Sequence, residues 1–330
     1  MNNSFSEISF HEFNRKSILK IVIPIALFIA LPVLVTNLFW LHVLILIFMY
    51  GVLGLSWNLI GGYTGQVSFM QAIFFGIGAY TSTVLSIKFG VNPWLGMFVG
   101  SCIAVIVSSI IGIFTFRLKG HYFAIATLGL GEIFGNIVRR WDFIGGARGL
   151  SIPMKEAGLI NFQFDGKIGY YYIAFGLIVF AMLLTYMVQR SKLGYYFRAI
   201  KGNSIAAKSI GIDVLKFKLI AFALSAFIAA LAGTFYAQYV LYIDPHSVLS
   251  NAISLQIVFI VILGGVGTIA GPVTGAFVLI VLQQFFSACF GGAKAIHLVI
   301  YGVSILLILL FEPDGLVAIY KNLYKKVMKI

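Results

Sequence analysis

Charged side chains are scarce in this sequence. Lys, Arg, Asp and Glu together make up 10% of its 330 residues, whereas about a quarter is usual for a soluble globular domain. Hydrophobic residues account for 61% of the chain, and the mean hydropathy is +1.02. The shortage of charge excludes an ordinary soluble domain and indicates a chain that lies in a lipid bilayer.

Acidic residues are the scarcest charged ones, with 10 Asp and Glu against 23 Lys and Arg and a net charge of +13. An excess of this size can indicate nucleic-acid binding. Here, however, the cations are confined to connections between apolar runs. Orientation in a membrane explains that distribution better, so we expect no nucleic-acid partner.

Residues for catalysis or metal binding are also missing. The two cysteines, Cys102 and Cys289, lie in apolar runs and imply neither a disulfide framework nor a metal site. The sequence has no H-E-x-x-H and no Ser and His arrangement within the predicted spans, which argues against an intramembrane enzyme. It also has no G-x4-G-K-[S/T] motif to bind ATP phosphates. We expect no catalytic residue, no metal and no cofactor bound by this chain.

Long apolar runs are what the sequence has in abundance. A membrane-spanning helix needs about 20 apolar residues. This measure predicts about ten segments, at 18–36, 38–60, 68–88, 94–117, 121–141, 169–190, 219–240, 252–265, 270–289 and 296–312. The eighth is short and can be either a full span or a re-entrant segment. The predicted fold is an all-α, polytopic bundle of transmembrane helices.

The cations favour one side of the membrane. With both termini cytoplasmic, sixteen of the 23 Lys and Arg residues lie inside and seven outside. Arg139 and Arg140 are among the seven outside and fit this orientation least well. Cytoplasmic loops carry the excess of Lys and Arg, so we expect this orientation. The expected layout is a cytoplasmic tail at 1–17, a transmembrane domain at 18–313 with a cytoplasmic loop at 190–218 and an external loop at 142–168, and a basic cytoplasmic tail at 314–330.

Two glycine-rich interruptions break the apolar runs, at Gly61–Gln71 and Gly264–Pro272. Broken helices in membranes are tolerated where the backbone is packed in protein or lines a wet cavity, and paired breaks in the two halves indicate a transport pathway. The alternative is that the glycines only allow close helix packing. The candidate pathway residues are Gly61, Gly62, Gln66, Ser68, Gln71, Gly264, Gly265 and Gly267.

Glu132 is an acidic residue well inside a predicted span. A carboxylate there is costly unless it faces the bundle interior or water. It therefore either lines or gates a pathway, or makes a structural hydrogen bond to a neighbouring helix.

The loop at 190–218 holds seven cations against one acid, Asp213. Each Lys or Arg at the bilayer centre costs about 3 kcal/mol, so this stretch is expected in water beside the membrane. Within it, Gly202 is predicted to end one short helix in the left-handed conformation, and Asn203 or Ser204 to cap the next.

That next helix is predicted at Ile205–Ile210, ending at Gly211, and Asp213 is predicted to cap the membrane helix that follows. Ala206, Ala207 and Gly211 would leave one side of the short helix almost without side chains. A partner protein could approach that side closely.

The stretch RAIKGNSIAAKSIGIDVLKFKLIAFALSAFIAALAG resembles the cytoplasmic coupling loop of ATP-binding cassette (ABC) importer permeases. In that family an Ala-Ala pair, followed four residues later by Gly, lies on a short helix that docks into the ATPase subunit. The match falls on Ala206, Ala207 and Gly211, and it assigns Lys208 between them to the same contact. Ile205 stands where an acidic residue is common.

Five further blocks resemble the branched-chain amino-acid permease family, LivM type: NLIGGYTGQVSFMQAIFFGIGAY, RLKGHYFAIATLGLGEI, FIGGARGLSIP, VILGGVGTIAGPVTGAF and LLFEPDGL. Together they run from about residue 57 to residue 316. Gln71 stands at a position where the family usually has His, which puts a strict substrate identity in doubt.

The resemblance implies a permease in the bacterial cytoplasmic (inner) membrane that imports branched-chain amino acids. Its implied partners are a homologous second permease, two ABC ATPase subunits that use ATP, and a periplasmic or lipid-anchored substrate-binding protein. The external loop either receives that binding protein or merely connects spans. The alternatives are the same machine importing urea, short amides or a sugar, or a motorless secondary transporter or channel.

Overall fold

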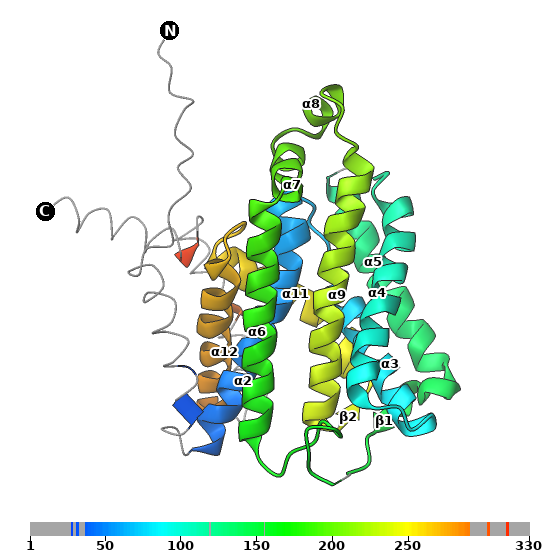
Figure 1. Ribbon diagram of the computed structural model, residues 1–330, viewed down its shortest axis with the longest axis vertical. Coiled ribbons are helices and arrows are strands. Elements are labelled where there is room, and N and C mark those ends of the chain that lie inside the picture. Colours follow the sequence, from blue (N-terminus) through cyan, green and yellow to red (C-terminus); the bar gives the residue numbers. More distant parts are fainter. Residues whose placement is uncertain are drawn as a thin grey trace, which may run out of the picture.

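The computed structural model describes residues 28, 31–32, 37–118, 120–154, 156–290, 302–303 and 315–316. The predicted segments 18–36 and 296–312 and the two predicted tails lie almost entirely outside these residues. Within the described part, long helices lie side by side along one axis and form a bundle (Figure 1).

The elements have the following bounds. The long helices are α2 (Leu38–Trp57), α3 (Gln71–Lys88), α4 (Pro93–Thr115), α5 (His121–Arg140), α6 (Lys167–Arg190), α9 (Val214–Val240), α11 (Asn251–Gly264) and α12 (Ala270–Phe290). The short helices are η1 (Asn58–Gly62), η2 (Asp142–Ile144), η3 (Gly146–Arg148), α7 (Lys192–Gly202), α8 (Ser204–Ser209) and α10 (Pro245–Leu249). The strands are β1 (Leu150–Ser151) and β2 (Tyr242–Ile243).

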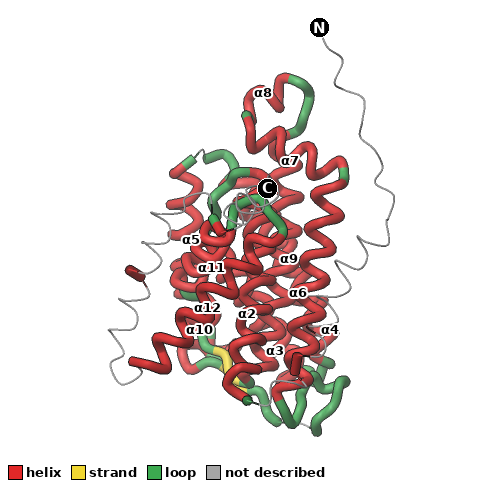
Figure 2. Tube along the Cα trace, turned by 90° about the vertical axis from the view of Figure 1, so that its left-hand side faces the viewer, coloured by secondary structure: helices red, strands yellow, loops and turns green. Residues whose placement is uncertain are grey.

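The bundle has two distinct ends (Figures 1 and 2). Helices α7 and α8 project beyond the long helices at one end, which we call the α8 end. The short β1–β2 ladder lies at the other end, which we call the β end. In the interior, α9 packs against α3 and α4, while α2 packs against α6 and α12.

Six stretches within the described residues are long and apolar enough to cross a membrane, namely Leu38–Gly62, Pro93–Thr115, Lys167–Arg190, Val214–Val240, Pro245–Gly264 and Ala270–Cys289. They match predicted spans in position. Helices α3 and α5 match the predicted segments 68–88 and 121–141 as helices but are more polar. The all-α membrane bundle is confirmed, and the total of ten spans stays a prediction.

The eighth predicted segment is the second part of a broken helix. Ser250 is extended (φ −69°, ψ 135°), separating α10 from α11 and accepting a hydrogen bond from the amide of Ala252 as the N-cap of α11. Because α10 follows β2 and α11 ends beside a residue of α7, the α10–α11 pair runs from the β end back to the α8 end.

The β1–β2 ladder was not expected from the sequence. It pairs Leu150 with Ile243 and Ser151 with Tyr242 in antiparallel register. It joins the loop after α5 to the connection between α9 and α10. Two strands of two residues each carry too little pattern for sequence analysis to detect.

Candidate functional site

The two glycine-rich interruptions contact each other. The first begins as a five-residue π-helix, η1, and the second follows α11, with Gly265 and Gly267 at φ of 126° and 81°. Asn58, which is fully buried, donates from Nδ2 to the carbonyl oxygen of Thr268 (2.8 Å) and accepts at Oδ1 from the amide of Gly267 (2.8 Å). Non-helical backbone at membrane depth needs such partners, and Asn58 supplies them.

The glycines at this junction allow backbones to touch. A Cβ placed on Gly62 would lie 2.9 Å from the amide nitrogen of Gly267, and one on Gly264 would lie 1.7 Å from a backbone oxygen of α12. A Cβ on Gly61 would lie 2.3 Å from the ring of Trp57. This geometry supports the close-packing interpretation of these glycines. That they also line a pathway stays a prediction.

Lys201 of α7 joins the same junction. Its Nζ donates to the carbonyl oxygen of Gly62 at 2.7 Å. A Cβ on Gly267 would lie 3.5 Å from this Nζ, and one on Gly65 would lie 3.3 Å from the Lys201 Cγ. One side chain from the cationic loop therefore contacts both interruptions.

The start of α3 is a second buried junction. Gln71, fully buried, donates from Nε2 to the hydroxyl oxygens of Ser56 (3.2 Å) and Ser225 (2.8 Å). The carbonyl oxygen of Ser68 accepts from the indole nitrogen of Trp57 (2.7 Å). These contacts connect α2, α3 and α9, so Gln71 contributes to helix packing at this junction.

Gln66 lies in a different setting, on a cavity of about 760 Å³ beneath α8. The cavity lies between the loop before α5 and the start of α9. Its charged lining is Arg117, Lys208 and Lys218 against Asp213. Of the predicted pathway and coupling residues, Gln66 and Lys208 are therefore brought together on one cavity.

Glu132 is an exposed residue on the outer face of α5. Its Oε1 accepts a hydrogen bond from Nδ2 of Asn251 (3.0 Å), and the same Nδ2 donates to the carbonyl oxygen of Leu128 (3.2 Å). The structural hydrogen bond to a neighbouring helix is thus present, joining α5 to the first residue of α11. Because the carboxylate also remains exposed, a pathway or gating role is still a prediction.

Helix α8 forms within the loop as the sequence indicates. Asn203 caps it, with Oδ1 accepting from the amides of Ile205 (2.9 Å) and Ala206 (3.1 Å), and Asp213 caps α9. The prediction of a left-handed Gly202 is wrong, since Gly202 lacks a positive φ. Asn203 is extended (φ −157°) and ends α7 by itself.

Gly211 closes α8 in a Schellman motif. It has φ of 88°, and its amide donates to the carbonyl oxygen of Lys208 (3.0 Å). The amide of Ile212 donates to the carbonyl oxygen of Ala207 (3.1 Å). These two bonds and the positive φ define the motif, and they confirm that Gly211 ends this helix in the left-handed region.

The exposed side of α8 differs from the expected one. Ala207 is only 3% exposed because α8 turns it toward the protein, so the prediction of a bare outer side is wrong for this residue. Ala206 is exposed, and it is flanked by Ile205 and Ile210, which are 73% and 76% exposed. Two large apolar side chains are therefore exposed on a loop that is otherwise cationic.

Several residues of this site were missed from the sequence: Asn58, Lys201, Ile205, Ile210 and Asn251. A polar amide within the apolar run 38–60 was a usable signal for Asn58. Lys201 gave no signal, because one cation in a loop with seven has nothing to distinguish it.

A sequence profile described as "Branched-chain amino acid transport system / permease component" matches residues 39–309. This match covers most of the chain. The chain belongs to this family. It is a family of transport permease components and not of enzymes.

Individual relatives of the family agree. The high-affinity branched-chain amino acid transport system permease protein LivM of Escherichia coli is 28% identical over 291 residues, covering 81% of this chain and 67% of the relative. The probable branched-chain amino acid transport permease proteins LivM and LivH of Methanocaldococcus jannaschii are 24% and 22% identical. The alignment with that LivM covers 86% of this chain and 95% of the relative, and the one with LivH covers 78% and 84%.

Proposed function

We propose that this chain is the permease subunit of an ABC importer that carries branched-chain amino acids across the cytoplasmic membrane. Family membership and the names of its LivM and LivH relatives support this cargo. The observation that carries the proposal is α8, a capped helix at the tip of the molecule that exposes Ile205, Ala206 and Ile210. It offers an apolar contact where a motor subunit can dock.

The path from this contact into the membrane is short. Asn203 is both the C-cap of α7 and the N-cap of α8, so the two helices share one residue as a joint. Lys201 lies two residues before it and binds Gly62. We propose that displacement of α8 by the ATPase moves α7, and that Lys201 passes this displacement to the junction of the two glycine-rich interruptions. Alternating access then follows from a shift between two packed states.

The orientation follows from charge. We propose that the α8 end is cytoplasmic, with both termini on that side, because residues 190–218 carry seven cations and one acid. The β end then faces the periplasm or cell exterior. There the loop 142–168, joined to α9–α10 by the β ladder, would receive the substrate-binding protein.

The second permease is proposed to cover the outer face of α5. At mid-helix this face exposes Glu132 beside Gly129, and a Cβ built on Gly129 would meet nothing within 4 Å. Polar groups inside a membrane face a partner or a water-filled path rather than lipid. Two such faces, one from each permease, would enclose the route of the amino acid.

The decisive experiment places a charge on α8. The complex is expressed with its ATPase, and Ile205→Asp and Ile210→Asp are compared with Tyr195→Asp, a control at an exposed aromatic residue of α7. Burying each isoleucine is worth about 1.5–3 kcal/mol, so each α8 variant should weaken ATPase binding at least ten-fold, about 1.4 kcal/mol. ATPase binding and leucine uptake in vesicles are measured.

The outcomes test docking through α8 and the identity of the substrate separately. Full ATPase binding and coupled uptake in both α8 variants would refute docking through α8. A wild-type complex that binds its ATPase but takes up urea, a short amide or a sugar, and no leucine, isoleucine or valine, would leave docking intact. That result would refute only the proposed substrate.

A further inference from the structure

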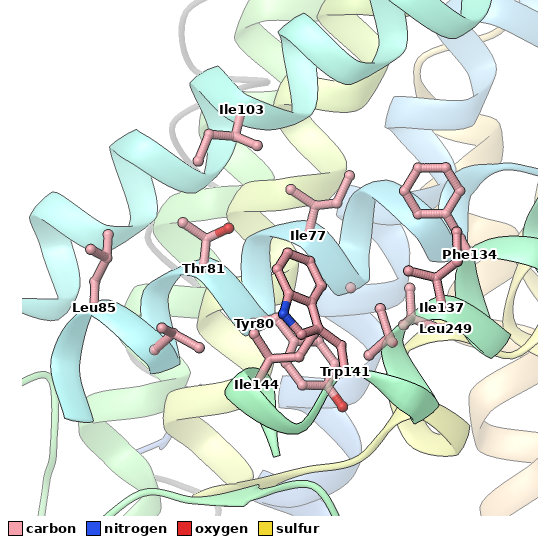
Figure 3. Close-up of a pocket in the computed structure, with 13 residues that line it drawn as sticks. Ile77, Tyr80, Thr81, Leu85, Ile103, Phe134, Ile137, Trp141, Ile144 and Leu249 are labelled. Atoms are coloured by element: carbon pink, nitrogen blue, oxygen red, sulfur yellow. The ribbon is translucent and has the colours of Figure 1, made fainter. Parts of the chain in front are cut away.

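An apolar cavity of about 340 Å³ lies between α3, α4 and α5 toward the β end. Figure 3 shows the side chains around it, among them Ile77, Leu85, Ile103, Phe134, Ile137 and Trp141. An apolar cavity of roughly 150 Å³ already stays dry and binds benzene. A space more than twice that size, with almost no polar lining, is suited to hydrocarbon.

The cavity opens toward the bilayer. Ile103, Ile137 and Trp141 line it and are still 38%, 51% and 54% exposed. The outward face of α4 beside the opening consists of large exposed apolar side chains, namely Leu95, Phe98, Ile106, Ile110 and Phe114. Such a face contacts lipid tails rather than water, so lipid can enter the cavity from the side.

Three cations lie close in sequence to lining residues at the β end. Lys88 follows Leu85 by three residues, about 4.5 Å along the helix, and Arg139 and Arg140 directly precede Trp141. Within the described residues two of these side chains have neutral partners: Lys88 donates to the carbonyl oxygen of Phe143 and lies 3.7 Å from its ring centroid, and Arg139 donates to Oδ1 of Asn136.

Two acids lie at this end of the cavity. Asp142 directly follows Trp141, and a Cβ placed on Gly146 would lie 3.3 Å from its Oδ1. Asp244 lies within electrostatic range of Tyr80, which lines the cavity. Counting both acids with Lys88, Arg139 and Arg140 leaves a charge of +1. Arg139 and Arg140 are also the cations that the expected orientation explains least well, because they lie on the side with fewer cations.

We propose that the cavity binds one acyl chain of an anionic phospholipid, whose phosphate lies against Lys88, Arg139 and Arg140. Basic residues between transmembrane helices select anionic headgroups, and tryptophan is typical of the membrane–water boundary where Trp141 lies. A zwitterionic amino acid does not suit this cavity, because the hydroxyls of Tyr80 and Thr81 are too few partners for both an ammonium and a carboxylate in an otherwise apolar lining. The proposal is independent of the transported substrate.

The test uses the full-length chain in nanodiscs with photoactivatable phosphatidylglycerol or phosphatidylcholine at equal mole fraction. Mass spectrometry of the cross-linked peptides should place the acyl label within 77–85 and 134–141, with phosphatidylglycerol favoured. Ile103→Trp, which fills the cavity, should abolish this label. The matched control is Ile106→Trp, on the lipid-facing side of the same helix.

The headgroup contact is tested with the double variant Arg139→Gln, Arg140→Gln. Each cation near an anionic lipid surface is worth about a five-fold preference, so the preference for phosphatidylglycerol should fall roughly 25-fold. Lys167→Gln, at the start of α6 on the same end, is the control and should leave it unchanged.

Four results would overturn the proposal. The first is equal labelling by both lipids, and the second is labelling at 77–85 that persists in Ile103→Trp. The third is protection from labelling by leucine, which would make the cavity a substrate subsite. Loss of the headgroup preference on adding inorganic phosphate alone would instead assign the cations to a free anion, which also contradicts a lipid site.

Discussion

Gly211 gives the sharpest test of the coupling loop, because its requirement is purely conformational. It has φ of 88°, and a Cβ built on it meets nothing within 4 Å. Gly211→Val therefore creates no clash inside the chain. Its cost is the backbone strain of a β-branched residue at positive φ, about 1–3 kcal/mol, and this strain opposes the Schellman motif that ends α8.

The same loop offers a matched control. Gly202 also has open space around its Cβ position, but it lies at the end of α7 without a positive φ. Gly202→Val should therefore leave α8 intact, because valine is a better helix former than glycine. The two variants add the same side chain within one loop and differ in the backbone conformation they require.

We expect Gly211→Val to reduce the equilibrium constant for forming α8 by about 5- to 150-fold, the equivalent of 1–3 kcal/mol. Binding of the ATPase, measured by titration on the reconstituted permease, should weaken by up to the same factor, while membrane insertion stays normal. Equal ATPase affinity in Gly211→Val and Gly202→Val would refute the reasoning, because strain at Gly211 would then have no effect on docking.

Two further predictions follow from the site. Lys201→Met keeps the apolar stem of the side chain but removes the hydrogen bond to the carbonyl oxygen of Gly62. ATPase binding should stay normal, while the stimulation of ATP hydrolysis by substrate should fall roughly five-fold, the lower limit of a typical coupling energy. Unchanged stimulation would contradict a role for Lys201 in passing the displacement of α8 to the membrane helices. Glu132→Gln keeps a hydrogen-bond acceptor for Asn251 but removes the charge from the exposed face of α5. The complex should still assemble, and its uptake of substrate should change. Uptake identical to wild type across pH 5–8 would show that Glu132 has a structural role only.

Local structure could be predicted well from the sequence because its determinants are local. Asn203, Gly211 and Asp213 lie within a few residues of the ends they cap, and each has the predicted hydrogen bond or φ. The apolar runs gave the long helices for the same reason, since span length is a property of one continuous segment.

Contacts across the bundle could not be predicted in this way. The sequence analysis noted an interruption in each half but did not predict that the two contact each other, because the partners of Asn58 lie 209 and 210 positions away. The direction of Ala207 was predicted wrongly because α8 has only six residues. Its position against α7 and α9, rather than its own small-residue pattern, decides which side is buried.

The distance in sequence between Asn58 and Thr268 also has a consequence for biogenesis. At about 5–20 residues per second, synthesis of the intervening 210 positions takes roughly 10–40 s. During that interval α2 is already available for insertion, while the amide of Asn58 still lacks both of its final partners. Since an unsatisfied polar group is costly in hydrocarbon, water, the insertion machinery or another segment must hold Asn58 until residues 267 and 268 emerge. The junction where α2 passes into η1 is therefore completed only after most of the chain has been synthesised.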